Sequence, residues 1–84
     1  KDLQFVIQQE PNNLLARHYL AIYYEKKGLI GQSHLNTAII SLYSGRIKEA
    51  RRMAASAMKL LPNKSPDWYK ASDILETTNK DAHF

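Results

Sequence analysis

Cysteine is absent from this 84-residue chain, which excludes a disulfide framework and a thiol nucleophile and leaves the redox compartment open. No apolar run comes near the roughly 18 residues that a membrane helix needs, so we expect no membrane insertion. The chain also begins at Lys1, with neither a methionine nor a signal sequence. We therefore expect residues 1–84 to form one small domain that belongs to a longer protein.

The residues that are present alternate between helical patterns and helix-ending residues, with no strand pattern. Asn12 or Asn13 is suited to cap one helix and Ser65 another, while Gly28 and Gly45 are placed to end two more. The predicted helical segments are 2–9, 14–27, 31–43, 47–61 and one that follows Ser65. The sequence therefore predicts an all-α fold.

The segment 47–61 has the clearest inward face. Its apolar residues recur at helical spacing, and they are Ile47, Ala50, Ala54, Ala57 and Leu61. Lys48, Arg52 and Lys59 fall on the other side, and we expect them in solvent. The segment is thus predicted to pack through one face only.

The last segment is expected to turn Trp68, Ala71 and Leu75 inward. Beyond Thr77 the sequence is polar as far as Phe84, so we expect the helix to fray there. On this pattern the final helix ends close to Thr77.

The stretch from Ser44 to Asn63 resembles the second half of a tetratricopeptide repeat. That repeat places small or turn-forming residues at fixed positions, and Gly45, Ala50, Ala57 and Pro62 fit them in register, with Ala38 one helix earlier. Alanine permits close helix packing, and proline ends the helix. The resemblance implies antiparallel helical hairpins in a right-handed array of about four to five helices, which holds another polypeptide.

The repeat spacing contains an irregularity. The Pro11 and Pro62 junctions lie one and a half repeat lengths apart, for a repeat of about 34 residues. Three helical segments therefore lie between the junctions instead of two. Either 14–27 or 31–43 is the first helix of a repeat, and the two alternatives cannot both hold without an irregular half-repeat. Counted on from Pro62, Trp68 falls at the fourth consensus position of the next repeat. This position favours the second alternative, in which 31–43 is the first helix.

Longer stretches of the chain resemble the C-terminal repeat region of bacterial BepA-like zinc metallopeptidases. They are Pro11 to Tyr24, Gly28 to Gly31, Ser44 to Arg51, Leu60 to Trp68, and Asp73 to Leu75. The resemblance implies a periplasmic parent protease whose zinc-binding HExxH motif lies outside this chain. It also implies that this region binds substrates or docks on envelope proteins or on the parent catalytic domain.

We predict no catalysis, no metal site and no cofactor within the chain itself. His18 and His34 fall on successive helices and would need a third ligand such as Glu25, while His83 lies far along the sequence. Surface or packing roles explain these histidines more simply. We expect the isolated chain to hydrolyse nothing.

The formal net charge of +4 raises the alternative of a nucleic-acid-binding domain. The cations concentrate near one helix, and they are Arg46, Lys48, Arg51, Arg52 and Lys59. No aromatic residues alternate with them, so a solvated outer face is preferred and an acidic peptide is the better partner. We expect no specific nucleic-acid binding.

Our main hypothesis is a protein–protein interaction module that binds a protein or peptide segment in a concave groove. The predicted groove residues are Leu15, His18, Ile22 and Glu25 on one helix and Tyr69, Asp73 and Glu76 on the last. Such a groove requires Ile22 and Tyr69 to stay partly accessible. The alternative hypothesis is a passive buttress of a parent enzyme's catalytic domain, without any groove ligand.

Overall fold

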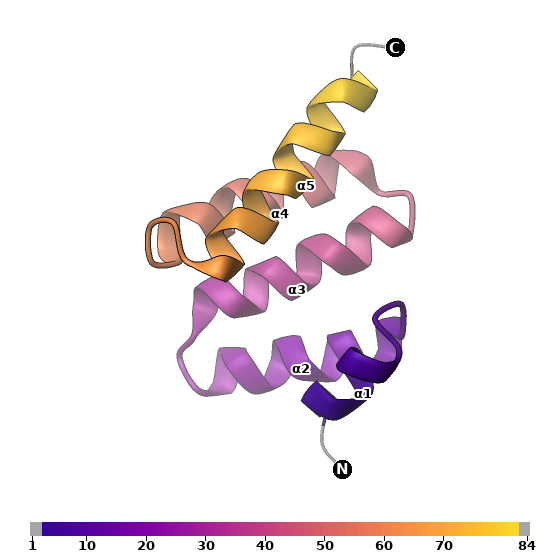
Figure 1. Ribbon diagram of the computed structural model, residues 1–84, viewed down its shortest axis with the longest axis vertical. Coiled ribbons are helices and arrows are strands. Elements are labelled where there is room, and N and C mark those ends of the chain that lie inside the picture. The colour runs from indigo at the N-terminus through magenta and orange to yellow at the C-terminus, as the bar shows by residue number, and fades with distance from the viewer. Residues whose placement is uncertain (1–2, 83–84) are drawn as a thin grey trace.

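The fold is all-helical over residues 3–82, which a computed structural model describes, with side chains described from residue 3 to residue 79 (Figure 1). Its five helices are α1 (Leu3–Gln9), α2 (Leu14–Lys26), α3 (Ile30–Tyr43), α4 (Ile47–Leu60) and α5 (Pro66–Ala82). Consecutive helices α2, α3 and α4 run antiparallel to one another. The predicted all-α array of helical hairpins is therefore confirmed.

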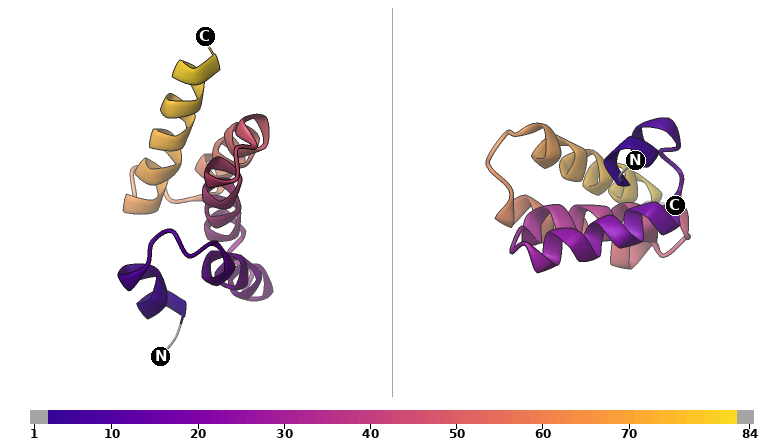
Figure 2. Two further views of the ribbon diagram at one scale, coloured as in Figure 1. Left: turned by 90° about the vertical axis from the view of Figure 1, so that its right-hand side faces the viewer. Right: turned by 90° about the horizontal axis from the view of Figure 1, so that it is seen from below.

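The helices form two layers (Figure 2). α2, α3 and α4 lie side by side in one layer, and α1 and α5 both lie on the same face of it. α1 packs on α2, whereas α5 packs on α4 and α3. The three helices between Pro11 and Pro62 thus make one continuous layer.

The helix ends follow the predicted capping residues. The side chain of Asn13 accepts a hydrogen bond from the Ala16 amide at 2.9 Å, and Ser65 Oγ accepts one from the Trp68 amide at 3.2 Å. Gly28 and Gly45 have φ values of 81° and 82°, in the left-handed region that favours glycine at a helix C-terminus. These local signals fix where α2, α3 and α5 begin or end.

The hydrophobic core lies where α3, α4 and α5 meet. Its buried members are Leu35, Ala38, Ala50, Ala54, Ala57, Leu61, Ala71 and Ile74. Lys48, Arg52 and Lys59 are exposed on the opposite side of α4, as the periodicity predicts. The inward face of α4 is therefore confirmed, except that Ile47 is only half-buried.

The end of α5 differs from the prediction, because the helix continues to Ala82 instead of ending near Thr77. Thr78 is completely buried, and its hydroxyl donates to the carbonyl oxygen of Ile74 at 2.9 Å. Because this bond satisfies the polar group inside the helix, a polar residue is accommodated at a buried position. Ile74 is buried, while Trp68 and Leu75 are only partly buried against the core.

α3 and α4 approach closely at Gly31. A Cβ atom placed there would lie 3.0 Å from the side chain of Leu61 and 3.2 Å from the backbone carbon of Leu60. A side chain at this position would require Leu61 and Leu60 to shift by a few tenths of an ångström, so the helix–helix contact favours glycine here. No helix of the described part of the chain is long and apolar enough to cross a membrane.

Candidate functional site: the cleft between α1 and α5

The four predicted groove residues on α2 share one surface of the molecule. Leu15, His18 and Glu25 are exposed, and Ile22 is half-buried. They lie on the side of α2 opposite its buried residues Ala16, Leu20 and Ala21, and so face away from α3. We call this surface, together with Tyr19 and Lys26, the outer face of α2.

The three predicted groove residues on α5 also share a surface. Tyr69 is 50% exposed, and Asp73 and Glu76 are exposed one turn apart, opposite the buried Ala71 and Ile74. Tyr69 and Ile22 therefore have the accessibility that a binding surface requires. The structure nevertheless does not bring the α2 set and the α5 set into one groove, because each set points away from the core of the fold.

A concave surface lies elsewhere, between α1 and α5 and above the helices α2 and α3. It encloses about 310 Å³. Its lining residues come from four helices and are Gln4, Ile7, Gln8, Arg17, Leu20, Tyr24, Leu35, Asn36, Ile39, Asp67 and Lys70. The predicted groove residues are not among them, and their role in binding a peptide stays a prediction. The cleft exists because α1 and α5 stand apart on the shared face of the other three helices (Figure 2).

The floor of the cleft is polar at one point, where Arg17 meets Asn36. Arg17 donates from one terminal nitrogen to Asn36 Oδ1 at 2.9 Å and from Nε to the Pro11 carbonyl oxygen at 3.2 Å. Asn36 is 5% exposed and also donates to the Gln32 carbonyl oxygen. These bonds hold the guanidinium in place and leave further N–H groups for a ligand.

Burial shapes the electrostatics of this floor. Desolvation lowers the pKa of Arg17, whereas the charge interaction with Tyr43 raises this pKa by a smaller amount. An arginine keeps its charge at physiological pH even so, because its ordinary pKa is far above 7. The cleft therefore contains a fixed cation in partly desolvated surroundings, where an anion is attracted more strongly than at the open surface.

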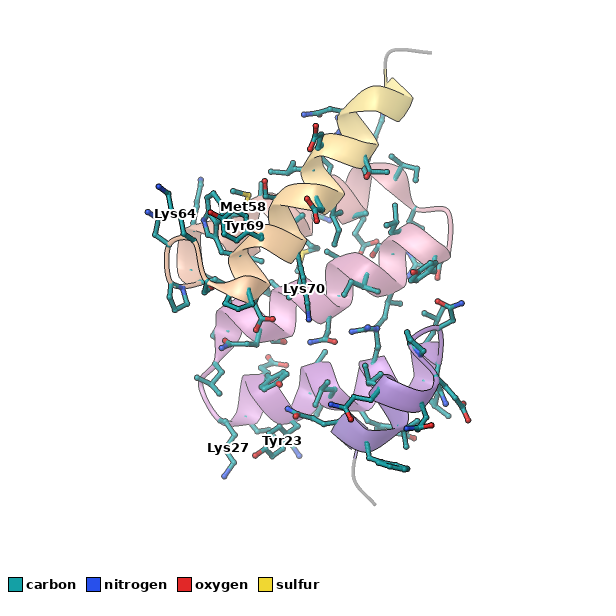
Figure 3. All side chains as sticks on the ribbon, in the orientation of Figure 1. Tyr23, Lys27, Met58, Lys64, Tyr69 and Lys70 are labelled. Carbon is teal, nitrogen blue, oxygen red and sulfur yellow. The ribbon has the colours of Figure 1, made fainter. Side chains whose placement is uncertain are left out.

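A second cation enters the cleft from α5. Figure 3 shows Lys70 extending from α5 across α3 toward α2. Lys70 lies 3.8 Å from Asp67, and both side chains are substantially exposed. Because an exposed pair at this distance is weak, Lys70 is free to turn toward an acidic ligand. With Arg17, Lys70 and Asp67 as the charged lining residues, the cleft has a net positive charge.

The sequence contained a signal for Arg17 and Asn36 that the pattern analysis missed. Asn36 lies beside Leu35 and Ala38 in the buried pattern of α3, and Arg17 follows the buried Ala16 in α2. A polar residue within a buried pattern requires a hydrogen-bonding partner. Two such residues on consecutive helices were therefore candidates for contact.

The two described histidines, His18 and His34, contact other kinds of side chain. His34 Nδ1 lies 2.9 Å from Ser56 Oγ, and the His18 ring lies 5.9 Å from the Tyr19 ring. His83 lies outside the described residues. Within the range that the structure describes, no three side chains of His, Asp or Glu are placed to hold a metal ion.

The five basic residues around α4 divide into two groups. Arg46 Nε lies 3.2 Å from Glu49, and Arg51 donates to the Thr78 carbonyl oxygen at 3.4 Å. Lys48, Arg52 and Lys59 remain as a line of exposed cations on α4. The line of exposed cations on α4 therefore contains three of the five basic residues that the sequence groups together.

Comparisons with known proteins add no assignment, because no family model, no curated protein and no solved structure matches the chain.

Proposed function

We propose that this chain is a protein–protein interaction module that binds a peptide segment carrying an acidic side chain in the cleft between α1 and α5. The observation that supports the proposal is the composition of the cleft. Arg17 is fixed on its floor by Asn36, and the neighbouring Leu20, Leu35 and Ile39 are apolar. Leu20 and Leu35 are nearly buried, so the accessible surface of the cleft is more polar than apolar. A segment with one carboxylate beside other polar groups matches that surface in charge and in polarity.

The size of the cleft favours a short contact. A volume of about 310 Å³ is near the lower limit of small-molecule sites, so it holds a few side chains and not a folded domain. The walls come from helices that are already formed, which reduces the ordering cost of binding. Gln4 and Gln8 on α1 supply amide groups that pair with the backbone of an extended segment.

The resemblance to BepA-like metallopeptidases extends the proposal to a parent protein. In that arrangement the module assists the zinc protease by holding a substrate or an envelope partner near its catalytic domain. An HExxH motif in the sequence that adjoins this chain in its parent protein is the expected finding. Its absence there would contradict the protease assignment and leave the cleft proposal standing.

The proposal is tested by selection from a random peptide library against the immobilised chain. We expect the selected peptides to be enriched in Asp and Glu, and their binding to shift the backbone NMR signals of Arg17, Asn36 and Lys70. Lys70→Gln should weaken binding by about 2- to 5-fold, as expected for an exposed ion pair worth up to about 1 kcal/mol.

Lys59→Gln is the matched control, because it also removes the charge of an exposed lysine but lies outside the cleft. Equal weakening by both variants would mean that net charge and not the cleft attracts the peptide. Selection of basic or uncharged peptides would contradict the role of Arg17. A selection without any binder would support the passive-buttress alternative.

A further inference from the structure

The outer face of α2 leaves large apolar side chains in solvent. Leu15 is 63% exposed, Tyr19 is 52% exposed, and the adjoining Tyr23 is 48% exposed. Tyr23 also carries the ammonium of Lys27 over its ring, 5.7 Å from the centroid. In the view from below in Figure 2, α2 lies open along its length. A contiguous apolar stripe of this kind marks an interaction surface.

The stripe is built from pairs of residues seven positions apart. Leu15 pairs with Ile22 at its centre, His18 with Glu25 along one edge, and Tyr19 with Lys26 along the other. Residues seven apart lie on nearly the same side of a helix, two turns from each other. The stripe is therefore about as long as α2 and has two chemically different edges.

We propose that this surface pairs with the same surface of a second copy of the chain, with the two α2 helices antiparallel. A two-fold axis across the helices brings each edge of the stripe against the same edge of the other copy. His18 then faces Glu25 of the second copy, and this polar contact forms twice. Tyr19 meets Tyr23 of the second copy along the other edge.

The charges at the end of α2 select the antiparallel direction. Lys26 and Lys27 follow one another at the C-terminus of α2 and are exposed. A parallel pair would gather four lysines at one end, whereas the antiparallel pair separates them by the length of the helix. The helix dipoles are also opposed in the antiparallel pair, which is the favourable arrangement.

The contact area limits the strength of the pairing. Two aromatic rings about half exposed, together with Leu15, offer roughly 300 Å² of apolar surface on each copy. A standard stable interface buries about 800 Å² on each partner. We therefore expect a weak, reversible dimer with a dissociation constant on the order of 100 μM, which does not depend on a ligand in the cleft.

Sedimentation equilibrium over a range of protein concentrations tests the pairing. Tyr19→Lys should raise the dissociation constant at least about tenfold, because it replaces an aromatic ring that meets Tyr23 of the second copy with a cation. Tyr69→Lys is the matched control, since Tyr69 is 50% exposed but lies on α5. A monomer at millimolar concentration, or equal effects of the two variants, would overturn the proposal.

The direction of pairing is tested with introduced cysteines, since the chain has none of its own. A mixture of the Leu15→Cys and Lys26→Cys variants should form a disulfide-linked heterodimer under mild oxidation, because the antiparallel pair places these positions opposite each other. Leu15→Cys alone should cross-link much less. Efficient cross-linking of Leu15→Cys to itself would show a parallel pair and overturn the antiparallel assignment. Circular dichroism of each variant confirms that it is folded.

Discussion

The helices α2 and α4 occupy the two ends of the same layer, and their outward surfaces differ in kind. α4 turns Lys48, Arg52 and Lys59 to solvent, whereas α2 turns out Leu15 and Tyr19. Helical arrays need a polar outer surface at an end that faces water. α4 supplies such a surface and α2 does not. One end of the layer therefore presents a charged surface to solvent, whereas the other presents large apolar side chains.

The contrast between α2 and α4 depends first on which side of α4 faces the core. The largest expected effect on stability therefore comes from a substitution on the buried side of α4. Ala50 is completely buried in the core. Ala50→Leu should lower the free energy of unfolding by about 1 to 3 kcal/mol, because a larger side chain forces the packed helices apart. Urea denaturation followed by circular dichroism measures the change.

Lys48→Leu is the control for this prediction. Lys48 lies two residues from Ala50 in sequence but is exposed, so the same new side chain should change stability by less than about 0.5 kcal/mol. If both leucine variants lowered stability equally, α4 would be rotated from the orientation described, and the contrast between the two ends would disappear.

A smaller effect is expected at the start of α2. The Asn13 side chain accepts a hydrogen bond from the Ala16 amide, so Asn13→Ala should cost about 1 kcal/mol of unfolding free energy. Asn12→Ala removes an exposed asparagine that precedes the cap and should cost much less. Thermal unfolding of both variants gives the comparison, and a greater loss with Asn12→Ala would move the cap by one residue.

The smallest effect on stability is expected from making the outer side of α4 resemble that of α2. The double variant Lys48→Leu with Arg52→Leu should change the free energy of unfolding by less than about 1 kcal/mol, because both sites are exposed. It should nevertheless cause association that increases with protein concentration, as the new leucines lie one turn apart. Light scattering that stayed at the monomer value would show that an apolar end is not sufficient for association.

The features that could be predicted from sequence are those decided within a few residues. Asn13 and Ser65 cap helices through bonds to amides three residues away, and Gly45 ends α3 through its own backbone conformation. The inward face of α4 was predictable because its apolar residues occupy one side only. α2 has apolar residues on both sides, yet the predicted groove residues Leu15 and Ile22 do lie on its accessible side, opposite the buried Leu20 and Ala21.

The cleft could not be predicted because it depends on which layer each helix occupies. The sequence indicated three helices between Pro11 and Pro62. It did not indicate that all three lie in one layer, because that arrangement depends on tertiary packing. The contact between Arg17 and Asn36 joins residues 19 positions apart. The burial of Thr78 likewise depends on how α5 lies against its neighbours, which its polar local sequence did not indicate.

The weak attachment of α1 has a consequence for exchange of amide hydrogens. α1 supplies one wall of the cleft, yet none of its described residues is buried. Its opening therefore requires less free energy than unfolding of the layer beneath it, and its amides should exchange with deuterated solvent long before those of α4. A ligand that contacts Gln4 or Ile7 stabilises only the closed form, so its binding should slow exchange in α1 more than in any other helix.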